Sequence, residues 1–260
     1  MTAVRIAGVD LAAQAAGTAL AVLHAGFDVP VTLESLQLGV DDDAIVKTSR
    51  HMGVVGIDCA FGWPIEFVQF VTRQAGGGAL EAGDSGDLAW RRRLAYRETD
   101  RVVTQRTGAR PLSVATDRLG MTALRCAVLL DRLATDGQVV DRSGGHPSAV
   151  VEVYPAMALR VWGLARPGYK ATVDARRALI DDLERAAPWL RLGAHKALMV
   201  RSADALDAVL AALVALAHSR GASIPPTDDQ RQRARVEGWI AIPTVGLAEL
   251  GGVPLTNGIS

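Results

Sequence analysis

Hydrophobic runs that end in or contain an acidic residue recur along the chain. They are residues 4–10 (VRIAGVD), 53–58 (GVVGID) and 150–154 (VVEVY). Short, almost continuously apolar runs are typical of strands covered on both faces. Because an unpaired buried carboxylate costs several kcal/mol or more, we expect Asp10, Asp58 and Glu152 to have a specific purpose.

Further strands and a helix are predicted between the first two runs. Residues 17–23 and 31–38 have the composition of strands, and the short connections favour an antiparallel meander with the first strand. Three aspartates at 41–43 then open a helix that runs to about Arg50, since acidic residues suit a helix N-terminus. Residues 53–58 and 150–154 are thus the fourth and fifth strands.

The segment from 61 to 148 loses the strand pattern and is predicted to be a helical insertion. Pro64 suits the start of one helix, residues 88–106 form a strongly basic helix, and residues 120–133 form another. After the fifth strand we expect helices at 155–162, 172–187 and 203–219. The tail after Gly221 contains four prolines and is predicted to be mostly loop, with 238–243 as a short edge strand.

This order predicts an α/β fold with a mixed five-stranded sheet, flanking helices and a helical insertion after the fourth strand. The whole chain, 1–260, is expected to form one domain with the insertion at about 61–148. In this layout the first and fourth strands lie side by side, which brings Asp10 near Asp58.

Composition narrows the class of protein. The formal net charge is zero, so a constitutive nucleic-acid-binding surface is not expected and any basic patch must be local. The two cysteines have no metal-site spacing, and no run reaches the roughly 18 apolar residues of a membrane span. A reduced, cytoplasmic protein without a membrane partner is the expectation.

Five carboxylates form the candidate chemical constellation: Asp10, Asp58, Glu152, Asp204 and Asp207. Asp204 and Asp207 share one face of the predicted helix 203–219. Carboxylates gathered from separate elements offer hard oxygen ligands to Mg²⁺ or Mn²⁺, which suggests metal-assisted chemistry on a phosphate. Simpler roles stay open: an Asx-turn at Asp10, capping of the following loop by Asp58, and a helix cap at Asp204.

A local basic cluster is the candidate substrate surface. Arg93, Arg97 and Arg101 fall on one face of the predicted helix 88–106, and guanidinium groups suit bidentate phosphate contacts. Lys170 follows a Gly-Tyr pair in a loop and is a second candidate for neutralising a phosphate. The alternative is an ordinary solvated helix face and a surface lysine.

Several segments resemble the DUF429 family, described as predicted nucleases of the ribonuclease H-like fold. They are Gly8-Val9-Asp10, Gly56-Ile57-Asp58, Gly62-Trp63-Pro64, Arg97-Glu98-Thr99-Asp100, Val151 to Pro155 and Asp204 to Ala208. The resemblance runs from about Val4 to Pro243. It implies a ribonuclease H-like fold and a metal-dependent nuclease, with Asp10, Asp58 and Asp207 as metal ligands. It also implicates Glu152 and Asp204 in the site.

Two other functions remain open at this point. One is a small-molecule phosphotransferase or phosphatase on a related, actin-like core. The other is a non-catalytic protein of the same fold that binds nucleic acid or another ligand. We therefore expect Mg²⁺ or Mn²⁺ as the cofactor and treat DNA or RNA as a candidate partner.

Overall fold

The computed structural model describes residues 3–26, 29–79, 81, 83–147 and 149–253. A six-stranded sheet in the order β5-β4-β1-β2-β3-β6 forms the centre. Its strands are β1 (Val4–Asp10), β2 (Ala19–Ala25), β3 (Val31–Leu38), β4 (Val54–Asp58), β5 (Val150–Glu152) and β6 (Leu190–Arg191). The helices are α1 (Asp42–Ser49), α2 (Ile65–Ala75), α3 (Leu88–Ala95), α4 (Glu98–Thr107), α5 (Gly120–Thr135), α6 (Pro155–Val161), α7 (Val173–Ala186), α8 (Lys196–Arg201), α9 (Ala203–Ser219), α10 (Asp228–Glu237) and α11 (Leu247–Leu250).

The predicted α/β class and mixed sheet are confirmed. Strands β1, β2 and β3 form an antiparallel meander, while β4 pairs parallel to β1 and β5 parallel to β4. The predicted number of five strands is wrong, because β6 pairs parallel to the outer edge of β3. Two residues are too few to show a periodic pattern, so this strand leaves no signal in the sequence.

Three further predictions are corrected by the structure. The region after Gly221 contains α10, whose first turn is closed by Gln230 and Thr227 in a capping box. Residues 238–243 form no edge strand: Ile240 makes only an isolated bridge to Glu152. The predicted basic helix 88–106 is two helices, α3 and α4, separated by extended backbone at Tyr96 and Arg97.

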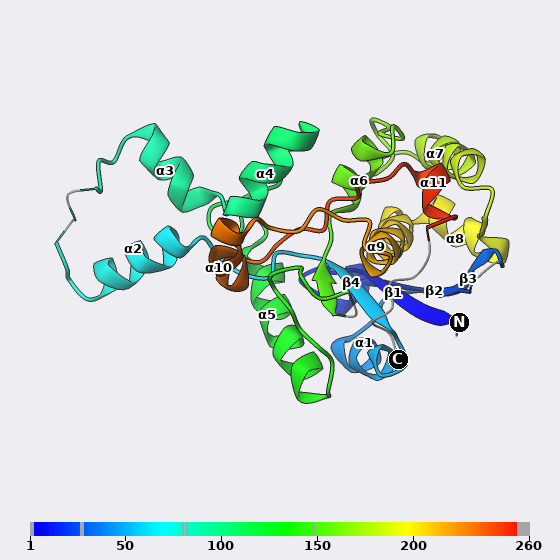
Figure 1. The fold of residues 1–260 in the computed structure, drawn as a ribbon, viewed down its shortest axis with the longest axis horizontal. Coiled ribbons are helices and arrows are strands. Elements are labelled where there is room, and N and C mark those ends of the chain that lie inside the picture. Colours follow the sequence, from blue (N-terminus) through cyan, green and yellow to red (C-terminus); the bar gives the residue numbers. More distant parts are fainter. Residues whose placement is uncertain (1–2, 27–28, 80, 82, 148, 254–260) are drawn as a thin grey trace.

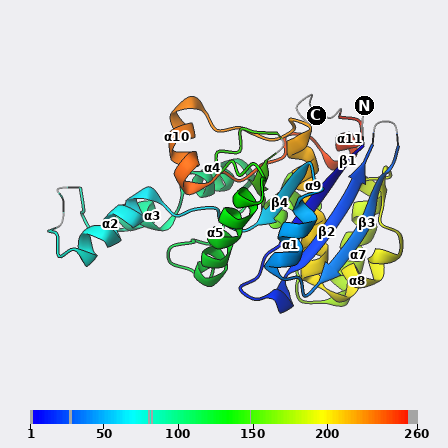
Figure 2. The ribbon, with the colours of Figure 1, turned by 90° about the horizontal axis from the view of Figure 1, so that it is seen from below.

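Two hydrophobic layers cover the sheet. Helix α9 crosses one face and packs with α6, α7 and α8, whereas α1 and α5 cover the other face (Figures 1 and 2). Helix α9 is buried along nearly its whole length, which explains its continuous run of alanine, leucine and valine. None of the helices in the described residues has the length and apolar character needed to cross a bilayer.

The segment predicted as an insertion divides into two parts. Helices α2 and α3 project away from the sheet in Figure 1, and neither contains a buried residue. An edge-to-face contact between the rings of Phe70 and Trp90, whose centroids are 5.2 Å apart, joins the two helices. Helix α5, by contrast, buries Leu129 and its neighbours against the sheet. Its exposed side carries Met121, Leu124 and Val128.

The approach of α9 to the sheet depends on Gly8. A Cβ atom on this residue would lie 2.1 Å from the Ala212 nitrogen and 2.2 Å from the Ala208 carbonyl oxygen. We expect Gly8→Ala to lower the free energy of unfolding by about 3 kcal/mol or more, because backbone has to move to admit the methyl group. Urea unfolding followed by circular dichroism measures the change.

Gly120→Ala is the matched control, because a Cβ there meets nothing within 4 Å. Similar unfolding free energies for the two variants would show that strand and helix do not approach as closely as described.

Candidate active site

Asp10 and Asp58 lie side by side at the ends of β1 and β4. The two strands are parallel and these residues are direct register partners. Side chains alternate along a strand, and Ile6 and Val54 face the α9 layer whereas Val9 and Ile57 face the α1 layer. Counting along each strand therefore puts both carboxylates on the α9 side, at the edge where the strands end.

Helix α9 brings a third carboxylate to this edge. Asp207 lies in its second turn and is only 1% exposed. The Tyr169 hydroxyl donates to Asp207 Oδ1 at 2.9 Å, and Lys170 Nζ forms an ion pair with Oδ2 at 2.7 Å. The Lys170 side chain is 60% exposed, so the cation reaches this buried carboxylate from the solvent side.

Asp204 lies one turn earlier on α9 and is partly exposed. The predicted helix-cap alternative for this residue is wrong, because Ser202 is the cap and accepts a hydrogen bond from the Ala205 nitrogen. Its charge nevertheless acts on Asp10 and Asp207. Asp204 is therefore at the rim of the same group. We call Asp10, Asp58, Asp204 and Asp207 the carboxylate cluster.

Mutual repulsion and burial make negative charge unfavourable within the carboxylate cluster. Burial raises the pKa of Asp10 to about 9, with further contributions from Asp58 and Asp207 and an opposing one from Lys170. Burial and then Asp207 raise the pKa of Asp58 to about 7. Burial also raises the pKa of Asp207, although Lys170 and Tyr169 oppose that change. The cluster therefore attracts protons and, by the same electrostatics, other cations.

The donor set fits a hard divalent cation in type, since carboxylate oxygens are the ligands that Mg²⁺ and Mn²⁺ prefer. Among the residues that the structure describes, however, no three His, Cys, Asp or Glu side chains are already arranged to hold a metal ion. Lys170 Nζ takes one oxygen of Asp207 instead. A metal ion bound at this cluster would compete with Lys170 for Asp207.

Glu152 does not join the carboxylate cluster. Its neighbours Val151 and Val153 face the α9 layer, so Glu152 points to the opposite side of the sheet. There Glu152 Oε1 pairs with Arg97 Nη2 at 2.7 Å, and Oε2 accepts from Arg97 Nη1 at 2.9 Å and from the Phe61 nitrogen at 3.0 Å. Its charge still contributes to the raised pKa of Asp58.

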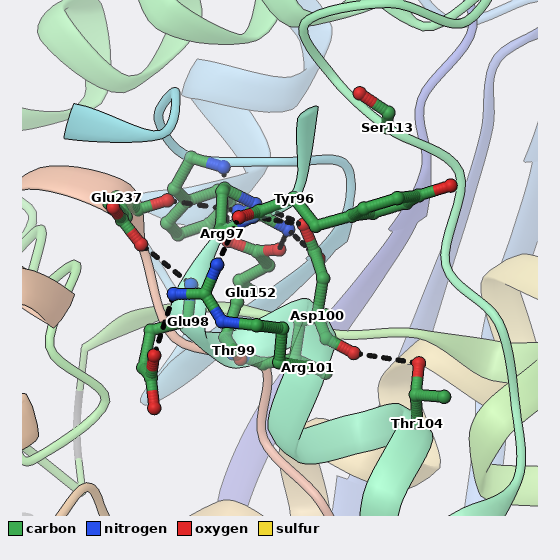
Figure 3. A network of polar contacts seen from close by, with 12 residues as sticks. Tyr96, Arg97, Glu98, Thr99, Asp100, Arg101, Thr104, Ser113, Glu152 and Glu237 are labelled. Carbon is green, nitrogen blue, oxygen red and sulfur yellow. Dashed lines mark hydrogen bonds and ion pairs between the residues drawn. The ribbon is translucent and has the colours of Figure 1, made fainter. Parts of the chain in front are cut away.

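Arg97 is the centre of this second, buried network (Figure 3). The side chain is 3% exposed. Its Nη2 also pairs with Asp100 Oδ1 at 2.9 Å, and its Nη1 donates to the Glu237 carbonyl oxygen at 3.0 Å. Burial opposes the charge, but the two carboxylates outweigh it and raise the pKa of Arg97. The arginine is therefore a structural cation between α4, β5 and α10.

The predicted arginine face does not exist as a single face. Because the chain is extended between α3 and α4, the i, i+4 spacing of Arg93, Arg97 and Arg101 no longer aligns them. Arg93 is exposed on α3. Arg101 on α4 pairs with Glu98 Oε2 at 2.7 Å and donates to the Tyr96 carbonyl oxygen. No glycine or proline interrupts residues 88–106, so the usual helix-breaking residues do not mark the break.

Two contacts in the site go beyond the sequence prediction. Tyr169 donates a hydrogen bond to Asp207, whereas the sequence predicts a role only for its neighbour Lys170. Asp100 accepts from the Arg97 nitrogen and closes the first turn of α4. An acidic residue three positions after the start of a helix is a recognisable capping signal, so Asp100 was visible in principle.

A family model described as "Protein of unknown function (DUF429)" matches residues 8–231. This range includes the carboxylate cluster, Lys170, Arg97, Asp100 and Glu152, but it ends before Glu237. The search of curated proteins gives no match. The search of solved structures gives none either.

Proposed function

The chain belongs to the DUF429 family, proteins of unknown function, and we propose that it is a metal-dependent hydrolase of phosphodiester bonds, a nuclease. The observation that carries the proposal is the meeting of Asp10, Asp58 and Asp207 from three separate elements at one edge of the sheet. The strand order and the antiparallel first three strands support the finer assignment to the ribonuclease H-like fold.

Carboxylates gathered in this way are unfavourable unless something compensates them. The raised pKa values of Asp10 and Asp58 express that cost. A purely structural group of this kind gains nothing from such repulsion, whereas in a cation site the bound ion compensates it. Carboxyl groups with strongly shifted pKa values are characteristic of functional sites.

In the proposed site Asp10, Asp58 and Asp207 would hold Mg²⁺ or Mn²⁺, with Asp204 at the rim. When bound, such an ion supplies Lewis-acid stabilisation of phosphate oxygens and activates water. Tyr169 orients Asp207 through its hydroxyl, which leaves the other oxygen of that carboxylate for Lys170 or a cation. Once released, the largely exposed Lys170 ammonium is placed to neutralise a substrate phosphate. Glu152 contributes indirectly, because it binds Arg97 and the backbone nitrogen of Phe61 in the segment after β4.

Metal binding is tested first by stability, independently of activity. A ligand present at about 100 times its Kd stabilises a fold by about 2.7 kcal/mol, so Mg²⁺ or Mn²⁺ should raise the Tm of the wild type. Asp58→Asn should lose most of that increase. Asp181→Asn, an exposed change on α7, should retain it. A wild-type Tm that neither ion changes would contradict the metal site.

Hydrolysis is tested with short DNA and RNA oligonucleotides in the presence of the metal. We expect Asp58→Asn to reduce the rate by more than the roughly 10–100-fold typical of residues that only support a metal ligand. ATP tested as a substrate separates a nuclease from a small-molecule phosphotransferase or phosphatase, since only the latter should turn over ATP and leave the oligonucleotides intact. Metal binding without hydrolysis of any of these substrates would leave a binding protein.

A further inference from the structure

A cavity of about 690 Å³ lies between α3, α4 and the loop that follows α4. Its basic and aromatic lining comes from Arg92, Arg93, Tyr96, Arg101 and Arg110. None of the four residues of the carboxylate cluster contributes to it. The volume is within the range of pockets that bind small molecules, about 300–1,000 Å³.

Three of the four guanidinium groups form no close ion pair. Arg92, Arg93 and Arg110 have no carboxylate within 4 Å in the part of the chain that the structure describes, and all three are exposed. Arg93 does act on the carboxyl of Asp87, whose pKa it helps to lower. Arg101 is already paired with Glu98. The pocket therefore has an excess of positive charge in a chain whose formal net charge is zero.

The only acidic residue in the lining does not offset this charge. Asp100 is 1% exposed, and both of its carboxylate oxygens bind Arg97. Its charge is thus balanced by Arg97, which does not line the pocket and lies beside Asp100 in the buried network of Figure 3. An anion entering the cavity meets guanidinium groups rather than a free carboxylate.

The walls of the pocket are held by buried contacts. The Arg97 network fixes the start of α4 to β5. Ser113 Oγ donates to the Ala95 carbonyl oxygen at 2.6 Å and ties the loop after α4 to the end of α3. Tyr96 lies between these anchors with its side chain partly exposed, so its ring is available at the pocket wall.

We propose that this pocket binds one nucleotide unit, with the phosphate on Arg92, Arg93 and Arg110 and the base against the Tyr96 ring. Guanidinium groups bind phosphate oxygens in pairs of parallel hydrogen bonds. An aromatic ring stacks on any base and adds affinity without strong sequence preference. The combination of several unpaired arginines with one accessible ring favours a phosphate attached to a base over an inorganic anion. The site is separate from the carboxylate cluster and does not depend on its activity.

The experiment measures the binding of AMP and of a short single-stranded oligonucleotide in EDTA, so that metal-dependent chemistry is absent. Isothermal titration should show binding of at least one of them, and adenosine and inorganic phosphate should each bind at least about 10-fold more weakly. Binding of AMP identifies a free nucleotide as a ligand. Binding of the oligonucleotide alone identifies a unit within a strand. No binding of either would overturn the proposal.

Variants assign the contacts. Arg92→Ala combined with Arg110→Ala should weaken binding at least about 10-fold and reduce its salt dependence. Tyr96→Ala should weaken binding, whereas Tyr96→Phe should preserve it. Arg106→Ala is the matched control, because it removes an exposed arginine of α4 that does not line the pocket. Equal affinities of the double variant and the control, or of Tyr96→Ala and the wild type, would overturn this assignment.

Discussion

Replacing Asp10 with asparagine is expected to stabilise the metal-free protein at neutral and alkaline pH. The change removes a carboxyl whose ionisation burial, Asp58 and Asp207 all disfavour. It keeps the size of the side chain, so packing against the α9 layer is little altered. A gain in stability when this acidic group is neutralised would reveal the cost of holding the carboxylate cluster together.

The pH dependence of this effect has a definite sign. The folded-state pKa of Asp10 is about 9, whereas an unfolded aspartate titrates near pH 3.9. Between these values the folded protein retains a proton that the unfolded chain has lost, so wild-type stability falls as pH rises. The advantage of Asp10→Asn should therefore grow from about pH 4 to pH 9 and then level off. Its slope is at most about 1.4 kcal/mol per pH unit for one proton.

Urea unfolding in EDTA at about pH 6, 7 and 8 measures this slope, because all three values lie between the unfolded-state and folded-state pKa of Asp10. Burial is the main cause of the raised pKa of Asp10, and the charges of Asp58 and Asp207 add to it. Asp181→Asn should track the wild type at each pH because its side chain is exposed on α7. If Asp10→Asn is less stable than the wild type throughout, burial and the neighbouring carboxylates do not disfavour the Asp10 charge as described.

The sequence predicted that Asp10 and Asp58 lie together, because each of them stands at the end of an apolar strand. Two apolar strands that each finish on an aspartate become neighbours once the sheet order is known, and register then pairs Asp10 with Asp58. Asp207 was also placed on α9 as expected. These inferences needed only strand ends and one long apolar helix, which are the strongest local signals in the chain.

The face of the sheet on which Glu152 lies and the burial of Arg97 could not be predicted from the sequence. Nothing in the sequence of β5 tells which face its middle residues take, and a one-residue difference in register reverses the face. Arg97 stands among seven arginines between 91 and 110, and local composition cannot tell a buried arginine from a solvated one. Its burial depends on Glu152 and Glu237, which are 55 and 140 residues away. Only the three-dimensional fold brings these groups together.

Replacing Arg97 with alanine is expected to destabilise the fold by about 3–5 kcal/mol, because it leaves two buried carboxylates without their cation. Those carboxylates belong to Asp100 and Glu152, which are 1% and 3% exposed. Arg97→Lys should not restore full stability, since one ammonium group cannot reproduce the paired contacts of a guanidinium. Urea unfolding at neutral pH measures both variants.

Arg93→Ala is the control for the loss of a positive charge from the same basic segment. Arg93 is exposed on α3 and forms no ion pair within the residues described by the structure, so its removal should change the unfolding free energy by no more than about 0.5 kcal/mol. The same variant should still weaken nucleotide binding if the arginine pocket is occupied as proposed. A stable Arg97→Ala protein that has lost only its affinity for oligonucleotides would instead assign Arg97 to phosphate binding, since a cation needed for folding cannot be removed without loss of stability.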